Sequence, residues 1–172
     1  MNFDLPIEQL VTRTDTRFQL GFATEARERV PAREEFVLSA SRRGLHVLAR
    51  NENSLSAPIE ALRQAYGQSL MVHEPQVRLI EGVQVQEPIM HVRISLETAH
   101  QDAVKRALLT RGATAEEEYT RVRHAVLRYE APLARLIGLP AELERLTSGS
   151  ARYWIVLSHY ALVTGGPGGR AA

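Results

Sequence analysis

The chain has 172 residues, of which 44% are hydrophobic and 24% charged, and its net charge is +1. This length suits one or two globular domains, and the charge balance gives no sign of a nucleic-acid partner. The absence of cysteine excludes disulfides, thiolate catalysis and cysteine-ligated metal sites. No apolar run approaches the ~20 residues of a membrane span, and the first residues lack signal-peptide character. We therefore expect a cytoplasmic protein without a membrane partner.

The first part of the chain is expected to contain a helix, a strand and a loop. Residues 4–11 predict a short helix, because their apolar side chains have helical spacing behind a possible Asp4 cap. Residues 17–24 alternate apolar and polar side chains and predict a strand. The charged residues 25–35, which include a proline, predict a loop.

A hairpin, a helix and an extended run are expected next. Residues 36–40 and 45–49 predict two paired strands across a turn. A turn over 51–54 leads into a helix that ends at Tyr66, just before a glycine. Residues 70–80 are extended, and the proline inside them indicates an edge strand or two shorter pieces.

The clearest pattern follows a short hinge over residues 82–86. In residues 87–96 apolar side chains occupy every second position, and His91, Arg93 and Ser95 share the other face, as in a half-buried strand. The order strand, helix, strand, strand, helix, strand then predicts a split βαβ, ferredoxin-like unit. The later elements are expected at residues 97–111, 116–123, 125–131, 132–146, with an interruption near 138–140, and 153–160, and the glycine-rich tail 164–172 is expected to be disordered.

Five short motifs occur in the order and spacing of the last domain of elongation factor G, which residues 87–163 therefore resemble. The motifs are Glu87-Pro88-Ile89-Met90, Arg111-Gly112, Ala131-Pro132-Leu133-Ala134, Leu146-Thr147-Ser148-Gly149 and Ser158-His159-Tyr160.

The end of the first half, residues 59–80, resembles the end of the third domain of the same factors and of their tetracycline-protection relatives. The resemblance implies an α+β fold of two ferredoxin-like halves, residues 1–81 and 87–163. The first half is expected to be incomplete or divergent, because the family's usual first strand is not visible before Asp4.

The family's catalytic part is missing from this sequence. Its GTPase domain needs a glycine-rich loop that ends in a lysine, whereas Lys105 is the only lysine here and no such loop precedes it. The family's β-barrel second domain and its fourth domain are also absent. We therefore expect a protein without catalytic activity or cofactor that binds the ribosome or another translation component. The alternatives are a protein-interaction or dimerisation module, and a fragment of a larger translational GTPase.

Candidate RNA contacts are Lys105, Arg106 and Arg111 on the helix after the long strand, and Arg42 and Arg43 at the hairpin turn. In the resembling factors the last domain lies against ribosomal RNA of the GTPase-associated region, which implies a similar face here. A solvated helix surface explains the same residues equally well. No aromatic ladder interleaves these cations, so stacking on single-stranded RNA is not indicated.

The last strand differs from the family pattern. If its alternate residues face the helices, Trp154, Val156 and Tyr160 lie on the outer sheet face, where the family usually has polar side chains. An exposed apolar face is expected to be covered, either by the first half of the chain or by a second copy in a homodimer. The six histidines are scattered, so no metal site is expected: His91 and His124 are interpreted as ordinary surface histidines.

Overall fold

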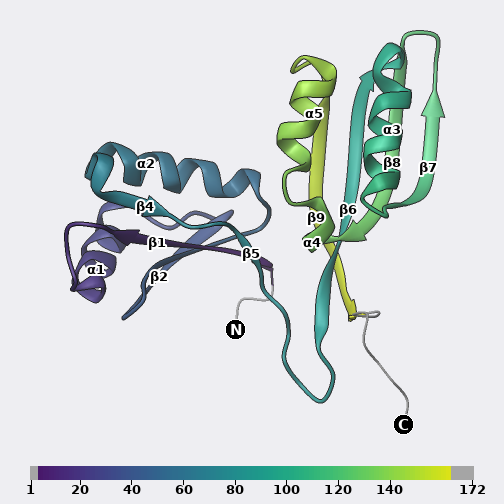
Figure 1. Ribbon diagram of the computed structural model, residues 1–172. Helices are drawn as coiled ribbons and strands as arrows, with labels where there is room; N and C mark the ends of the chain where they lie inside the picture. The colour runs from purple at the N-terminus through teal and green to yellow at the C-terminus, as the bar shows by residue number, and fades with distance from the viewer. Residues whose placement is uncertain (1–3, 164–172) are drawn as a thin grey trace.

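The computed structural model describes residues 4–163 and shows two α+β halves lying side by side (Figure 1). Each half is an antiparallel sheet with helices on one face. None of the helices within residues 4–163 combines the length and the apolar character that crossing a bilayer would require.

The first half has the complete βαββαβ order of a ferredoxin-like unit. Its main sheet runs in the order β2-β3-β1-β4, and β5 pairs with the other part of β1. The expectation of an incomplete first half is therefore corrected. The elements are β1 (Ile7–Arg13), α1 (Gln19–Arg29), β2 (Phe36–Ser41), β3 (Gly44–Ala49), α2 (Ser56–Tyr66), β4 (Leu70–Val72) and β5 (Gln76–Val77).

The two opening predictions are wrong, and each has a physical reason. The expected helix at residues 4–11 is largely strand β1, whose Ile7 and Val11 are fully buried and oppose Ala49 and Leu45 of β3. The first strand of the family's third domain, which was not recognised from sequence, is therefore present as β1. The expected strand at residues 17–24 is mostly helix α1, because burial follows a helical repeat that continues into the supposed loop.

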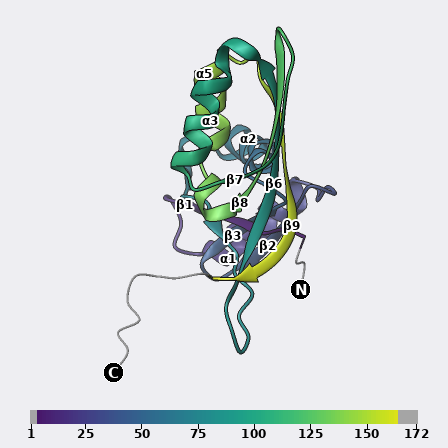
Figure 2. The same cartoon turned by 90° about the vertical axis from the view of Figure 1, so that its right-hand side faces the viewer.

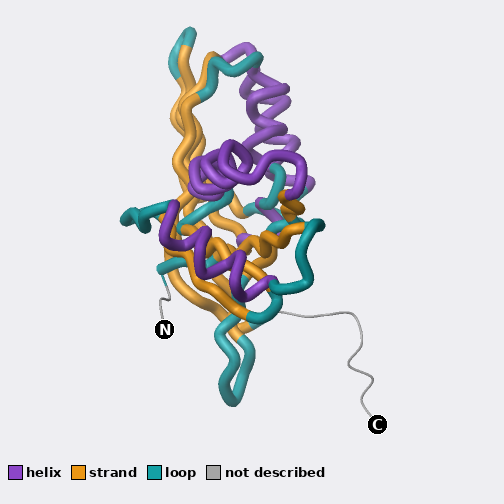
Figure 3. The backbone as a smooth tube through the Cα atoms, turned by 90° about the vertical axis from the view of Figure 1, so that its left-hand side faces the viewer, coloured by secondary structure: helices purple, strands orange, loops and turns teal. Residues whose placement is uncertain are grey.

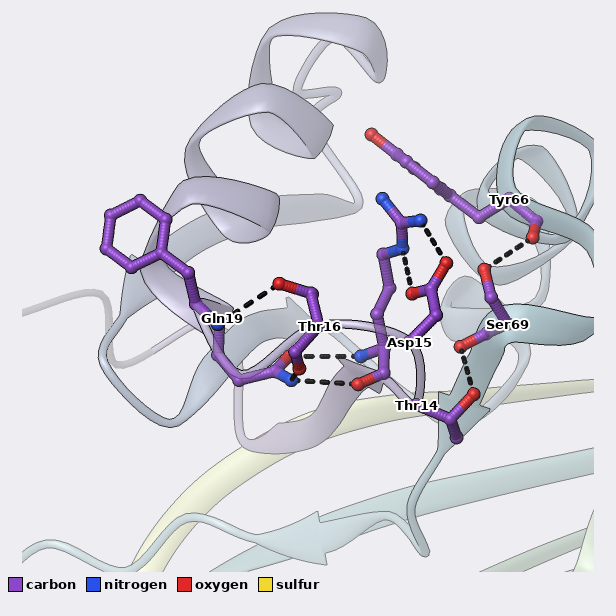
Figure 4. A network of polar contacts seen from close by, with 8 residues as sticks. Thr14, Asp15, Thr16, Gln19, Tyr66 and Ser69 are labelled. Carbon is purple, nitrogen blue, oxygen red and sulfur yellow. Dashed lines mark hydrogen bonds and ion pairs between the residues drawn. The ribbon is translucent and has the colours of Figure 1, made fainter.

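A network of polar contacts fixes the start of α1 (Figure 4). The Gln19 side chain accepts a hydrogen bond from the Arg13 amide at 3.0 Å and donates to the carbonyls of Arg13 and Thr16 at 2.8 and 2.7 Å. Arg13 also pairs with Asp15 and lies over the ring of Tyr66 on α2. These contacts join the end of β1 to both helices, so the turn into α1 is specified by side chains.

The remaining predictions for the first half are confirmed. The hairpin β2–β3 forms, and α2 ends before Gly67, whose φ of 57° is a left-handed conformation that favours glycine. The extended run divides into the short strands β4 and β5, on either side of Pro75.

The second half has the predicted ferredoxin-like topology, with the sheet order β7-β8-β6-β9. In β6, Met90, Val92, Ile94 and Leu96 are buried, and His91 and Arg93 are exposed on the opposite face. Helices α3 and α5 cover only the buried face of the sheet (Figure 2). The elements are β6 (Gln86–Glu97), α3 (Gln101–Thr110), β7 (Thr114–Thr120), β8 (His124–Pro132), α4 (Leu133–Leu136), α5 (Leu139–Thr147) and β9 (Arg152–Leu162).

The expected hinge is the tip of a hairpin-like loop. Ile80 and Gln86 exchange two backbone hydrogen bonds, of 2.9 and 3.0 Å, and residues 81–85 project away from both halves (Figures 1 and 3). The predicted disordered tail, residues 164–172, lies outside the described residues.

The two halves touch through the segment that connects β3 to α2. The Asn51 amide donates to the carbonyl of Ile155 at 3.0 Å, and the Glu52 carboxylate accepts from the backbone amide of Gly138 at 2.8 Å. The Asn53 side chain bonds the Tyr153 hydroxyl at 3.1 Å. These contacts join the first half to β9 and to the start of α5, and most buried apolar residues of both halves belong to one continuous core.

Candidate functional site

Two of the three cations predicted on α3, Lys105 and Arg111, form ion pairs with glutamates of the same chain. The Lys105 ammonium lies 2.6 Å from Glu118 of β7, which ties the helix to an edge strand. Hydrogen bonds from Lys105 and from Tyr129 lower the pKa of Glu118, so the carboxylate stays charged. Arg106 differs, because it is exposed and its guanidinium donates to the carbonyl of Asp102 in its own helix at 3.3 Å.

Arg111 has a structural role at the end of α3. Its guanidinium donates to the carbonyls of Arg135 and Ile137 at 2.8 and 2.9 Å, and twice to Glu142 at 3.0 and 2.8 Å. The next residue, Gly112, has φ of +71°, which a side chain would strain. The Arg111-Gly112 motif therefore closes α3 and holds the α4–α5 connection. With all these bonds made, Arg111 is poorly placed to contact RNA.

The predicted cations do not form one surface. Arg42 and Arg43 are exposed at the β2–β3 turn, in the first half, whereas Lys105 and Arg106 lie on α3 in the second half. Arg106 borders a hollow of about 500 Å³ between α3 and α5, whose lining includes Ala103, Leu146 and the Arg111–Glu142 pair.

The outer face of the second sheet is the other candidate surface. Arg93 lies with its guanidinium carbon 5.5 Å from the centre of the Trp154 ring, and Arg128, directly opposite Arg93, pairs with Glu117 at 2.8 Å. Beside them a hollow of about 400 Å³ is lined by His91, Val92, Arg93, Glu116, Arg128, Trp154 and Val156. The alternation of β6 places His91 and Arg93 on this face from sequence, but the pairing of β6 with β8 and β9 comes only from the structure.

The first half of the chain does not cover this face. Trp154 and Val156 are each 52% exposed, which contradicts the expectation that intrachain packing would bury them. The hydrogen bonds from Asn51 and Asn53 reach the backbone of β9 at Ile155 and the side chain of Tyr153, which alternates with Trp154 and so lies on the opposite face. Cover by a second copy remains a prediction.

Tyr160 does not share the outer face with Trp154. Met90 opposes Leu157, but Ile89 opposes His159, so Ser158 is an extra residue in β9. This bulge shifts the alternation by one position and turns Tyr160 to the face that carries the helices. Burial there raises the pKa of the Tyr160 hydroxyl. The prediction failed because alternation alone cannot reveal a bulge.

Comparisons with known proteins agree with the motifs. Residues 84–169 match the family model described as "Elongation factor G C-terminus". The protein named "Large ribosomal subunit assembly factor BipA" from Haemophilus influenzae is 35% identical over 123 residues, which are 70% of this chain and 20% of that protein. The protein of the same name from Escherichia coli is 36% identical over 120 residues, 66% of this chain and 19% of that protein. This chain thus spans about a fifth of the length of these relatives.

Two further similarities are shorter or structural. "Ribosome-releasing factor 2, mitochondrial" from Danio rerio is 33% identical over 79 residues, 46% of this chain and 10% of that protein. A crystal structure from Thermus thermophilus superposes with a TM-score of 0.63, covering 92% of this chain and 41% of that chain at 14% identity, and it supports the fold. The family match spans half of the sequence. The chain therefore belongs to the elongation factor G C-terminus family.

Proposed function

We propose that this chain is a non-catalytic, translation-factor-related protein that binds the ribosome, with the large subunit as its first target. The observation that carries the proposal is its membership of the elongation factor G C-terminus family, together with relatives whose names refer to the ribosome. The proposed place of action is the cytoplasm. The family match is to a C-terminal domain, so binding, and not catalysis, is the proposed activity.

The proposed RNA-binding surface combines Arg106 with the end of the second half farthest from the first. At this distal end α3 begins, β7 turns into β8, and β9 begins (Figure 1). Arg121, Arg123 and Arg152 are exposed there, and Glu97 and Asp102 reduce their net charge. Arginine suits phosphate contacts because its planar fork donates several hydrogen bonds.

The turn that carries two of these arginines is held in place. Thr98 donates from its hydroxyl to the carbonyl of Arg121 at 3.0 Å, and from its backbone amide to that of Arg123 at 3.3 Å. These bonds attach the β7–β8 turn to the start of α3. The backbone that carries Arg121 and Arg123 is therefore held in place, which lowers the conformational entropy lost when these side chains bind phosphates.

Sedimentation with ribosomes tests the proposal. Wild-type protein is expected to travel with large subunits at low salt and to leave them at high salt, because phosphate contacts release counterions. An Arg106→Ala, Arg123→Ala double variant is expected to sediment less at the same salt. Arg27→Ala is the matched control, since it removes an exposed helical arginine from α1 in the first half. Sedimentation of the double variant equal to that of wild type would reject this surface.

The second candidate function is a dimerisation module. It is favoured by the exposure of Trp154 and Val156 on an open sheet face. Sedimentation equilibrium of the purified protein separates the two functions: a stable dimer that a Trp154→Ser substitution dissociates, without ribosome binding, supports dimerisation. A monomer that binds ribosomes supports the first proposal.

A further inference from the structure

Two histidines and two glutamates lie close together on the outer face of the second sheet. Each strand supplies one of them: His91 from β6, Glu116 from β7, Glu130 from β8 and His159 from β9. We propose that these four side chains form a binding site for a divalent transition-metal ion of the Zn²⁺ class. The proposal does not depend on ribosome binding, and it reverses the expectation from sequence that the chain has no metal site.

The register of the sheet brings the four residues together. His91 and Glu130 oppose each other directly on the two central strands, so their side chains share a face. Each edge strand then carries a bulge close to this pair: Glu116 is the extra residue in β7, and the extra Ser158 in β9 turns His159 outward. Bulges commonly re-aim side chains next to functional sites. Here both edge strands are irregular where they supply a candidate ligand.

Three distances between ligand atoms are close to those around a tetrahedral ion, whereas His159 stands outside the group of three residues whose ligand atoms all lie near one another. His91 Nδ1 lies 3.2 Å from an oxygen of Glu116 and 4.0 Å from Oε1 of Glu130, and His159 Nδ1 lies 3.6 Å from that same oxygen. Candidate ligand atoms of His91, Glu116 and Glu130 all lie within 4.8 Å of one another. Zinc bonds of about 2.1 Å in tetrahedral geometry place ligand atoms about 3.4 Å apart. The observed distances lie on either side of this value.

The chemistry of the group also suits a cation. Two carboxylates held this close repel each other, and a divalent ion between them removes the repulsion. Imidazole and carboxylate are ligands that zinc accepts together. The side chains of His91 and His159 are 46% and 53% exposed, so an ion can reach them from solvent. Binding through Nδ1 of His159 replaces its 2.9 Å contact with the Ser158 hydroxyl.

His124 provides a matched control. It lies on the same face and bonds the Ser95 hydroxyl at 2.7 Å, but it opposes Glu97. Glu130 is six positions further along β8, which is about 20 Å along a strand. Replacing His124 removes an exposed histidine from the same sheet and leaves the proposed site intact.

Calorimetric titration with Zn²⁺ of the metal-free chain, without a histidine tag, tests the proposal. We expect one ion per chain, and at least tenfold weaker binding in His91→Ala, His159→Ala and Glu130→Gln, whereas His124→Ala binds as wild type. No saturable binding by the wild type, unchanged affinity in both site-histidine variants, or an equal loss in His124→Ala would overturn the proposal.

A second measurement separates lost ligands from lost structure. Co²⁺ in place of Zn²⁺ gives visible absorption bands that report its coordination geometry. We expect a tetrahedral spectrum for wild type and for His124→Ala, and none for the His91→Ala, His159→Ala double variant, whose far-ultraviolet circular dichroism stays unchanged. An identical spectrum in the double variant would place the bound metal elsewhere and refute the site.

Discussion

Replacing Arg111 with alanine is expected to destabilise the fold markedly. The substitution removes two hydrogen bonds to main-chain carbonyls and the ion pair with Glu142. The carbonyl bonds contribute about 1 kcal/mol each. The ion pair, whose side chains are 22% and 29% exposed, contributes about 1 kcal/mol after solvent screening. The expected loss is therefore about 3 kcal/mol, a large share of the ~5–15 kcal/mol of a typical domain.

Urea unfolding followed by circular dichroism measures this loss, and in a chain of this size it corresponds to a fall in Tm of about 6–12 °C. Arg106→Ala is the control, because that exposed arginine on the same helix should change the unfolding free energy by less than about 0.5 kcal/mol. A loss below about 1 kcal/mol in Arg111→Ala, or equal losses in both variants, would refute the structural role of Arg111.

Three further predictions concern nucleotide binding, the sheet face and pH. The purified chain should neither bind a fluorescent GTP analogue nor hydrolyse GTP, because no phosphate-binding loop is present; micromolar binding would contradict this. Trp154 should be quenched by iodide in dilute solution, and protection at every protein concentration would show that the face is covered. Burial and the hydrogen bond to Glu118 raise the pKa of Tyr129 above that of free tyrosine. The tyrosine of the unfolded chain therefore ionises first, and stability should fall above about pH 10. The fall should be less steep in Tyr129→Phe, and equal pH profiles of Tm in the wild type and this variant would contradict the prediction.

The second half could be predicted from sequence because its pattern is simple. The alternation of β6 agrees with the buried positions of the structure. Of the four residues predicted to face inward on the following helix, Val104, Ala107 and Leu108 are buried, whereas Ala99 is exposed because it precedes α3. Local pattern and tertiary packing point to the same elements there.

The first half was harder to predict because its apolar residues fit both the helical and the strand repeat. Ile7 and Val11 fit both a helix and a strand, and pairing with β3 decides for the strand. Phe22 alternates with its neighbours, but Ala23 and Ala26 are buried with it, which only a helix allows. Short apolar runs are settled by tertiary contacts that local sequence does not contain.

The site was predictable only in part. Arg106 lies on the surface as expected, but the partners of Lys105 and Arg111 come from β7 and α5, and their distance in sequence hides them. The proposed metal ligands come from four strands and depend on two bulges, so spacing gave no signal for them.

The salt dependence of binding to purified large ribosomal subunits tests the central proposal most directly. We expect the logarithm of the association constant to fall linearly with the logarithm of salt concentration, and the Arg106→Ala, Arg123→Ala variant to lower that slope by about one unit for each lost phosphate contact. Arg27→Ala should leave the slope unchanged. Tight binding with no salt dependence, or identical slopes in wild type and double variant, would contradict ribosome binding through these arginines.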